Sequence, residues 1–171
     1  MPLSKDDLKS NILSVYNDVM SGKISFSNPP NPAPPQMANE LAAALADAYD
    51  KYAKNAQAGA LTTIVTPGLK TGLQSFLNAP DYSGWGPGVA AYWAPVTFTG
   101  GGYIPANPMV QLPTLAVGIS GEIQGYIQTS RDSIDKAAAD LAQILHSWTV
   151  KLTVTAITTS TPPVTSIEMV S

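Results

Sequence analysis

His146 is the chain's only histidine and so the first side chain to consider for chemistry. Nucleophilic catalysis by a Ser–His–Asp arrangement needs a local nucleophile signature, and the sequence has no GxSxG elbow. A zinc or calcium site needs clustered ligands, yet neither an HExxH motif nor EF-hand spacing occurs. His146 falls in the last turn of a predicted helix, where it can interact with the helix dipole. We therefore predict no catalytic residue, no metal site, no cofactor and no enzymatic activity.

Paired carboxylates and a glycine run are the remaining chemical candidates. The pairs Asp6–Asp7 and Asp132–Asp135 fall near predicted helix N-termini, where negative charge interacts favourably with the dipole. The run from Gly100 to Gly102 matches neither the GxxxxGK[ST] phosphate loop nor the GxGxxG pattern. Both features therefore indicate structural roles.

Composition restricts the classes of partner. Of the 171 residues, 44% are apolar and only 12% are charged, about half the usual charged share. A surface so poor in charge indicates protein–protein contact; a neutral surface rich in Thr, Ser and Asn is the alternative. The net charge of −3 and the absence of a Lys or Arg run argue against nucleic-acid binding, which needs clustered cations. The sequence has no run of about 18 apolar residues, so we expect no membrane span. Its N-terminus lacks the apolar core of a signal peptide.

The clearest element is a helix predicted over residues 37–59. Leu41, Leu45, Tyr49 and Tyr52 share one face of it, and Gly59 suits a left-handed C-terminal cap. The same periodicity predicts further helices over residues 4–22, 68–77, 89–93, 114–128 and about 130–148. The first of these is either a core helix or an arm lying on a neighbouring subunit.

Strands are predicted over residues 60–67, 96–99, 149–156 and 164–170. In the third, Val150, Leu152 and Val154 alternate with threonines, a pattern typical of a half-buried strand. The C-terminus is then a β-hairpin or an extended tail. We expect this strand to pair with the sheet edge of another chain, and name these three residues as interface candidates.

Two other segments supply interface candidates. Five prolines between Pro29 and Pro35 favour extended backbone, either a stiff connector or a ligand for an aromatic groove, and Pro29, Pro34 and Pro35 are the candidates. Trp85 is expected in a loop over residues 78–88, close in sequence to Tyr92 and Trp93. These three aromatic side chains either plug into the core or a neighbour, or line a ligand pocket.

Three stretches carry a resemblance to a known class of proteins: LAAALADAYDKYAKNA, VAAYWAPVTF and KAAADLAQILHSWTVKLTVTAITTSTPP. Together they resemble small virion structural proteins of tailed bacteriophages, of the neck, connector or tail-completion type. The resemblance implies a non-enzymatic subunit that forms a homo-oligomeric ring around the DNA conduit and contacts other virion proteins. It also implies assembly in the host cytoplasm and residence in the virion, with no sequence-specific nucleic-acid binding and no membrane.

Two alternative functions remain open from the sequence. One is a capsid decoration or baseplate protein. The other is a small ligand-binding module or enzyme with a pocket around Trp85, Tyr92 and Trp93.

The predicted fold is α+β and mainly helical. It is a bundle of three or four helices with a small antiparallel β-hairpin or sheet and long Pro/Gly-rich loops. We expect a single domain over residues 1–171, divided into an N-terminal helix and proline-rich arm (1–36), a helical core (37–148) and a C-terminal strand, hairpin or arm (149–171).

Overall fold

The computed structural model describes residues 2–22, 35–64, 68–79, 81–108, 112–129 and 131–171. These residues form an α+β fold that is mainly helical. The helices are α1 (Lys5–Met20), α2 (Pro35–Ala53), α3 (Gly68–Leu77), α4 (Trp85–Trp93), α5 (Leu112–Gln128) and α6 (Ile134–Thr149). The strands are β1 (Gln57–Ala58), β2 (Leu61–Ile64), β3 (Thr97–Thr99), β4 (Thr153–Ile157) and β5 (Thr165–Met169). The predicted class is confirmed, but the described residues form six α-helices rather than three or four.

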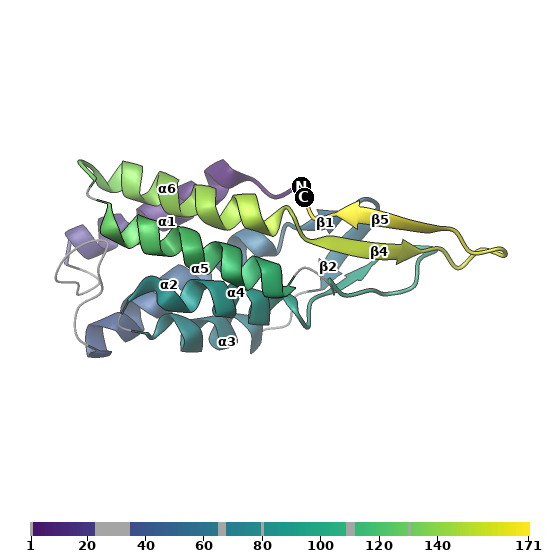
Figure 1. The fold of residues 1–171 in the computed structure, drawn as a ribbon, viewed down its shortest axis with the longest axis horizontal. Helices are drawn as coiled ribbons and strands as arrows, with labels where there is room; N and C mark the ends of the chain where they lie inside the picture. The colour runs from purple at the N-terminus through teal and green to yellow at the C-terminus, as the bar shows by residue number, and fades with distance from the viewer. Residues whose placement is uncertain (1, 23–34, 65–67, 80, 109–111, 130) are drawn as a thin grey trace.

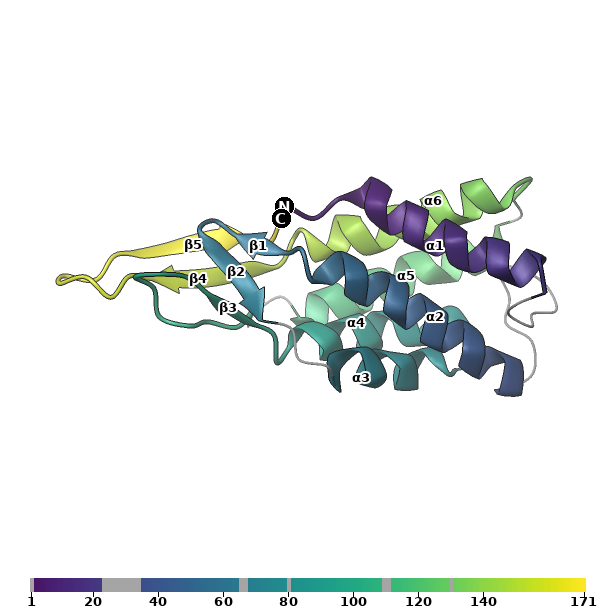
Figure 2. The ribbon, with the colours of Figure 1, turned by 180° about the vertical axis from the view of Figure 1, so that it is seen from behind.

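Helices and strands occupy opposite ends of an elongated molecule (Figure 1). The helices run along the long axis, and each packs on its neighbours in sequence, with α6 packing back on α1. The two chain termini lie side by side where the helices meet the strands, as both views show (Figures 1 and 2). We call the two ends the helical end, formed by α1 to α6, and the strand end, formed by β1 to β5. The chain leaves the helical end, forms strands and returns to it more than once.

The first helix is a core helix and not an arm. Ser4 caps it, because its hydroxyl accepts a hydrogen bond from the Asp7 N–H at 3.1 Å. Tyr16 is fully buried, and α1 packs against both α2 and α6. At the C-terminal end of the helix Val19 is buried, whereas Met20 is 62% exposed.

The central helix α2 differs from its predicted bounds at both ends. It begins at Pro35, a residue type favoured in the first helical turn. The helix therefore starts two residues before the predicted position 37. It ends at Ala53, because residues 57–64 form a hairpin in which Ala58 lies opposite Leu61. Gly59 does adopt a positive φ of 56°, as predicted, but in the hairpin turn rather than at a helix cap.

The segment predicted as a loop over residues 78–88 instead leads into α4. A short 3₁₀ turn over Tyr82–Gly84 precedes the helix. Its glycines permit close packing: a Cβ atom at Gly84 would overlap the backbone carbonyl of Phe76, and one at Gly86 would overlap the carbonyl of Ala116 on α5. Glycines that suggested turns from the sequence therefore serve helix–helix contact.

The strands form two antiparallel sheets, ordered β1–β2–β3 and β4–β5. Three isolated bridges join them: Ala58 with Val170, Phe98 with Ala106, and Tyr103 with Thr158. Backbone pairing therefore runs from β4 through β5, β1, β2 and β3 and returns to β4 through residues 102–106. This closed circuit surrounds buried side chains such as Leu61, Phe98 and Val154.

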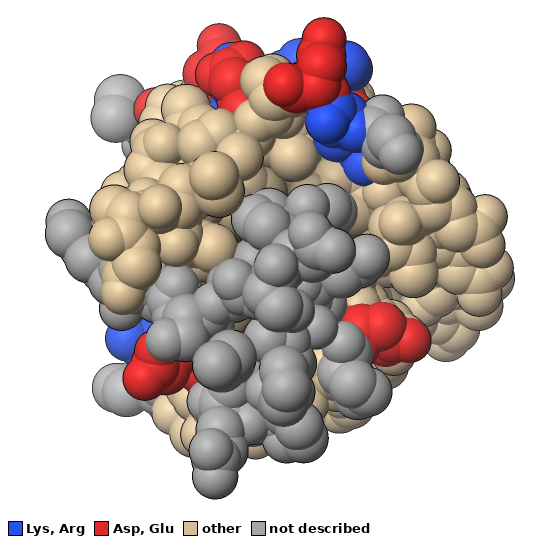
Figure 3. Space-filling view, turned by 90° about the vertical axis from the view of Figure 1, so that its left-hand side faces the viewer, with Lys and Arg blue, Asp and Glu red and all other residues tan. Residues whose placement is uncertain are grey.

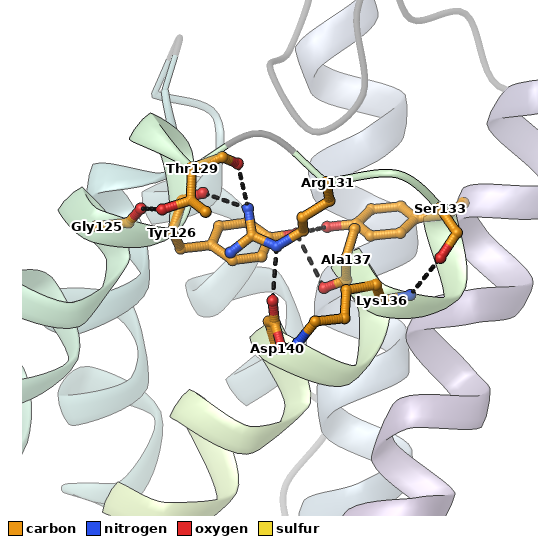
Figure 4. A network of polar contacts seen from close by, with 9 residues as sticks. Gly125, Tyr126, Thr129, Arg131, Ser133, Lys136, Ala137 and Asp140 are labelled. Atoms are coloured by element: carbon orange, nitrogen blue, oxygen red, sulfur yellow. Dashed lines mark hydrogen bonds and ion pairs between the residues drawn. The ribbon is translucent and has the colours of Figure 1, made fainter.

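A cationic clamp fixes the corner between α5 and α6 (Figure 4). The Arg131 guanidinium donates to the carbonyls of Tyr126 and Thr129 at 2.6 and 2.7 Å and to the Asp140 carboxylate at 2.8 Å. It also lies 4.2 Å from the centroid of the Tyr126 ring. Ser133 caps α6 by accepting from the N–H of Lys136. Arg131 thereby satisfies carbonyls at the end of α5 while anchoring α6.

Candidate functional site

The β4–β5 hairpin has one buried and one exposed face. Thr155 lies opposite Ile167 in the register, and Thr153 opposite Met169. Ile167 is 74% exposed and Met169 is 59% exposed. On the other face Val154 is buried in the core. Ile167 and Met169 of β5 thus expose large apolar side chains to solvent, while β4 contributes Val154 to the core.

Two isoleucines extend this surface: Ile157 at the end of β4 and Ile104 on the segment beside it. The Ile104 N–H donates to the carbonyl of Ile157 at 2.8 Å, which places the two residues opposite each other. Ile104 is 48% exposed. We call Ile104, Ile157, Ile167 and Met169 the outer face. Contiguous exposed apolar residues of this kind mark contact surfaces.

The strand end is almost without charge. The sequence contains no Asp, Glu, Lys, Arg or His between Asp81 and Glu122, and Glu168 is the only one between Lys151 and the C-terminus. Ion pairs lie on the helices instead, as with Lys9–Asp135 and Lys136–Asp140. Figure 3, which views the molecule from its helical end, shows one group of Lys, Arg, Asp and Glu along the upper rim, where α1 and α6 lie, and smaller groups at the lower left and lower right.

The residues predicted to form an interface, in and just before β4, are mainly buried. Leu152 and Val154, predicted to meet another chain, are 0% and 1% exposed and belong to the core. Val150 is half-buried at the C-cap of α6. An alternation of period two identifies two faces of a strand but does not say which one the core takes. Two features of the sequence could have indicated the exposed face. One is the absence of charge over residues 152–167, and the other is the presence of Ile167 and Met169 on β5, which are not buried in the core.

Trp85, Tyr92 and Trp93 lie in the core and not on a surface or around a pocket. Each is at most 1% exposed. Trp93 Nε1–H donates to the Tyr49 hydroxyl at 2.8 Å, and the Tyr92 hydroxyl donates to the Asp50 carboxylate at 2.9 Å. The three side chains fill the space that a ligand would need, and the polar atoms of Tyr92 and Trp93 are hydrogen-bonded within the core.

A cavity beside Trp85 has a volume of about 20 Å³, room for about one water molecule. The indole Nε1 of Trp85 is buried and has no protein hydrogen-bond partner within the described residues. This space cannot hold an organic ligand.

The proline candidates are resolved only in part. Pro29 and Pro34 lie outside the described residues. Pro35 is the first residue of α2 and so belongs to a helix rather than to an extended arm.

Buried polar side chains link α2 to α4 and α6. The Tyr49 hydroxyl lies 2.7 Å from the Thr149 hydroxyl, which in turn donates to the Leu145 carbonyl. Burial raises the pKa of Tyr49 well above its usual range. Asp50 is 2% exposed and pairs with Lys54 at 2.6 Å. These groups are all committed to one another, so the network stabilises the helical end rather than offering a reactive group.

His146 belongs to the same polar layer. Its Nδ1 lies 2.9 Å from the Tyr52 hydroxyl. Partial burial, and then the charge of Lys5, lower the pKa of the imidazole below its usual value of 6.5. Among the described residues no three His, Cys, Asp or Glu side chains are grouped so that they could hold a metal ion.

A scan of protein-family models, a search of curated proteins and a search of solved structures each match nothing. In the described part of the chain, no helix combines the length and apolarity that crossing a membrane requires. The candidate site therefore rests on its own geometry: the outer face and the hairpin that carries it.

Proposed function

We propose that this chain is a structural subunit of a tailed-bacteriophage virion that self-associates through its strand end as a ring in the neck, connector or tail region. The observation that carries the self-association is the outer face, where Ile104, Ile167 and Met169 are exposed on the uncharged end of the molecule. Burying such side chains against a neighbour is favourable by about 25 cal/mol for each Å² of apolar surface removed from water.

The division of charge supports the same function. An end whose one charged residue is Glu168 makes little long-range attraction to nucleic acid or to an oppositely charged partner. It does allow identical subunits to approach with little electrostatic repulsion. The charged helical end keeps the assembly in solution. The assignment to a phage virion rests on the resemblance of the helix and strand segments described above.

The test is the native mass of the protein over a range of concentrations, by analytical ultracentrifugation, with electron microscopy of the oligomer. We expect one discrete oligomer that appears as a closed ring. Ile167→Asp, which places a carboxylate in the outer face, should dissociate it.

Val117→Asp is the matched control. Val117 is 73% exposed, about as much as Ile167, but it lies on α5 and not on the outer face. It should leave the oligomer intact. A protein that stays monomeric at every concentration, or an oligomer lost equally with both variants, would contradict the proposal.

A further inference from the structure

The β4–β5 hairpin has two backbone edges that face in opposite directions. Leu152 accepts from the N–H of Val170 at 2.8 Å, and Val164 accepts from the N–H of Thr158 at 2.9 Å. In an antiparallel ladder the residues that exchange such bonds alternate with residues whose N–H and C=O groups point away from the partner strand. The outward-pointing groups are therefore those of the odd-numbered residues, on β4 and on β5 alike.

Along each edge, another segment of the same chain pairs with the backbone at one end and leaves the rest of the edge unpaired. On β4, the segment containing Ile104 pairs with Ile157 and leaves Thr153 and Thr155 open. On β5, strand β1 pairs beyond Met169, where Gln57 exchanges two hydrogen bonds with Ser171. Within the described residues, Thr165 and Ile167 have no backbone partner on their outward side.

The open edges lack the features that normally protect a sheet from pairing with another chain. Such protection comes from charged side chains, bulges or proline within the edge. Here residues 152–167 contain no charged side chain, and prolines occur only at the hairpin tip, at positions 162 and 163. Glu168 is the one charged residue of β5, and it lies opposite Val154, on the other face of the hairpin from Ile167. An occupant must therefore be an extended strand that is itself uncharged.

We propose that the occupant is a second copy of this chain, joined head to tail, with the β5 edge of one copy paired to the β4 edge of the next. The proposal rests on the self-association proposed above and adds to it a backbone pairing at the edges of the sheet that carries the outer face. The open positions match in charge, because Thr165 and Ile167 on one edge and Thr153 and Thr155 on the other are all neutral. The two edges also match in direction: when the ring axis runs along the strands, copies related by rotation keep the same strand direction, so β5 and the next β4 run antiparallel, as they do within one hairpin.

The outward-pointing N–H and C=O groups of the open positions set the register between β5 of one copy and β4 of the next. Thr165 lies opposite Thr155 of the next copy, and Ile167 lies opposite Thr153 of the next copy, so each pair can exchange two hydrogen bonds. Repetition of this contact produces a closed band of strands, two from each subunit. A head-to-tail contact closes into a ring when its rotation permits, whereas a two-fold contact between β5 strands would stop at a dimer.

Cross-linking of single-cysteine variants tests this pairing, because the natural chain has no cysteine. Thr165→Cys and Thr155→Cys would each be expressed alone and then co-expressed, and treated with a short bismaleimide. We expect a cross-linked dimer only from the co-expressed pair. Using one cysteine in each chain excludes cross-links within a single hairpin. Co-expression of Thr155→Cys with Ser75→Cys, an exposed position on α3, is the control and should give no product.

The possible outcomes separate this inference from the proposed function. Cross-linked dimers from Thr165→Cys alone would mean two-fold pairing and would overturn the inference. A discrete oligomer by native mass with no product from the co-expressed pair would also overturn it, while leaving the structural function intact. A protein that is monomeric at every concentration would overturn both.

Discussion

The hydroxyl of Tyr52 on α2 lies 2.9 Å from Nδ1 of His146 on α6, with the two rings in an edge-to-face contact at 5.9 Å between centroids. The imidazole thus joins two helices that are far apart in sequence. Lys5 and Asp6 on α1 are the charged residues that act on it, and of the two Lys5 has the larger effect.

The free energy of unfolding should depend on pH through His146, because burial and then the charge of Lys5 lower its pKa in the folded protein. The pKa of His146 is lowered in the folded state, so the unfolded chain binds the proton more tightly. The stabilisation from neutral His146 is therefore complete above about pH 6.5 and is lost as the pH falls through 6.5 toward the lower folded pKa. Urea unfolding between about pH 8 and pH 5 would measure the slope. His146→Gln should flatten it, and an unchanged slope in that variant would exclude this origin.

Removing the buried carboxylate of Asp50 should be strongly destabilising. Asp50→Ala leaves the Tyr92 hydroxyl, which is buried on α4, without its acceptor, at a cost of about 2 kcal/mol. Asp50→Asn keeps an oxygen for Tyr92 to donate to and loses only the charge that pairs with Lys54. We expect the Asn variant to be more stable than the Ala variant in urea unfolding. Equal stability of the two variants would show that the hydroxyl does not depend on this acceptor.

Two glycines of α5 should respond oppositely to alanine. A Cβ at Gly118 would overlap the ring of Trp148, which Glu122 holds by a 2.7 Å hydrogen bond, whereas a Cβ at Gly121 would meet open space. Gly121→Ala should stabilise the protein by up to about 1 kcal/mol through helix propensity. Gly118→Ala should instead destabilise it by about 1 kcal/mol, because the indole must shift. Thermal unfolding and tryptophan fluorescence measure both effects, and stabilisation by both variants would disagree with this packing.

Replacing Arg131 by lysine should not preserve the corner between α5 and α6. One ammonium group cannot reproduce the planar contacts to two carbonyls, a carboxylate and the face of Tyr126. We expect Arg131→Lys to lose about 1–3 kcal/mol of stability. Lys136→Met removes the other cation that pairs with Asp140, but from an exposed position, and should change stability by less than about 1 kcal/mol. A loss from Lys136→Met as large as that from Arg131→Lys would indicate that the ion pair alone matters.

The periodic elements were predictable from the sequence because their patterns depend on local geometry. α3 has the predicted bounds, and α1, α5 and α6 agree within a few residues. The errors arose where one residue type serves two purposes. Gly84 and Gly86 allow close packing of α4 rather than a loop, and Gly59 turns a hairpin rather than ending a helix.

The sequence named interface residues in and just before β4, and the structure buries two of them, Leu152 and Val154, in the core. Alternation in β4 shows that one set of side chains is buried, and only the three-dimensional arrangement shows that Val154 belongs to that set. Ile104 could not have been grouped with Ile167, because a cross-strand hydrogen bond over more than fifty residues of intervening sequence brings its strand alongside. The aromatic candidates failed for a related reason: a tryptophan between glycines suggests an exposed loop until helix packing encloses it.

The closed circuit of strands also bears on how the molecule acquires its shape. Each helix contacts its sequence neighbours, so most of the helical end can form from contacts that are close along the chain. The strand end draws on residues 57–64, 97–106 and 153–171, and its circuit closes when Ser171 pairs with Gln57. Distant pairings of this kind carry a larger loop-closure cost and form more slowly. We therefore expect the β4–β5 hairpin to form early as a local element, and the pairings that join it to residues 57–58 and 102–104 to be among the last contacts of the molecule to form.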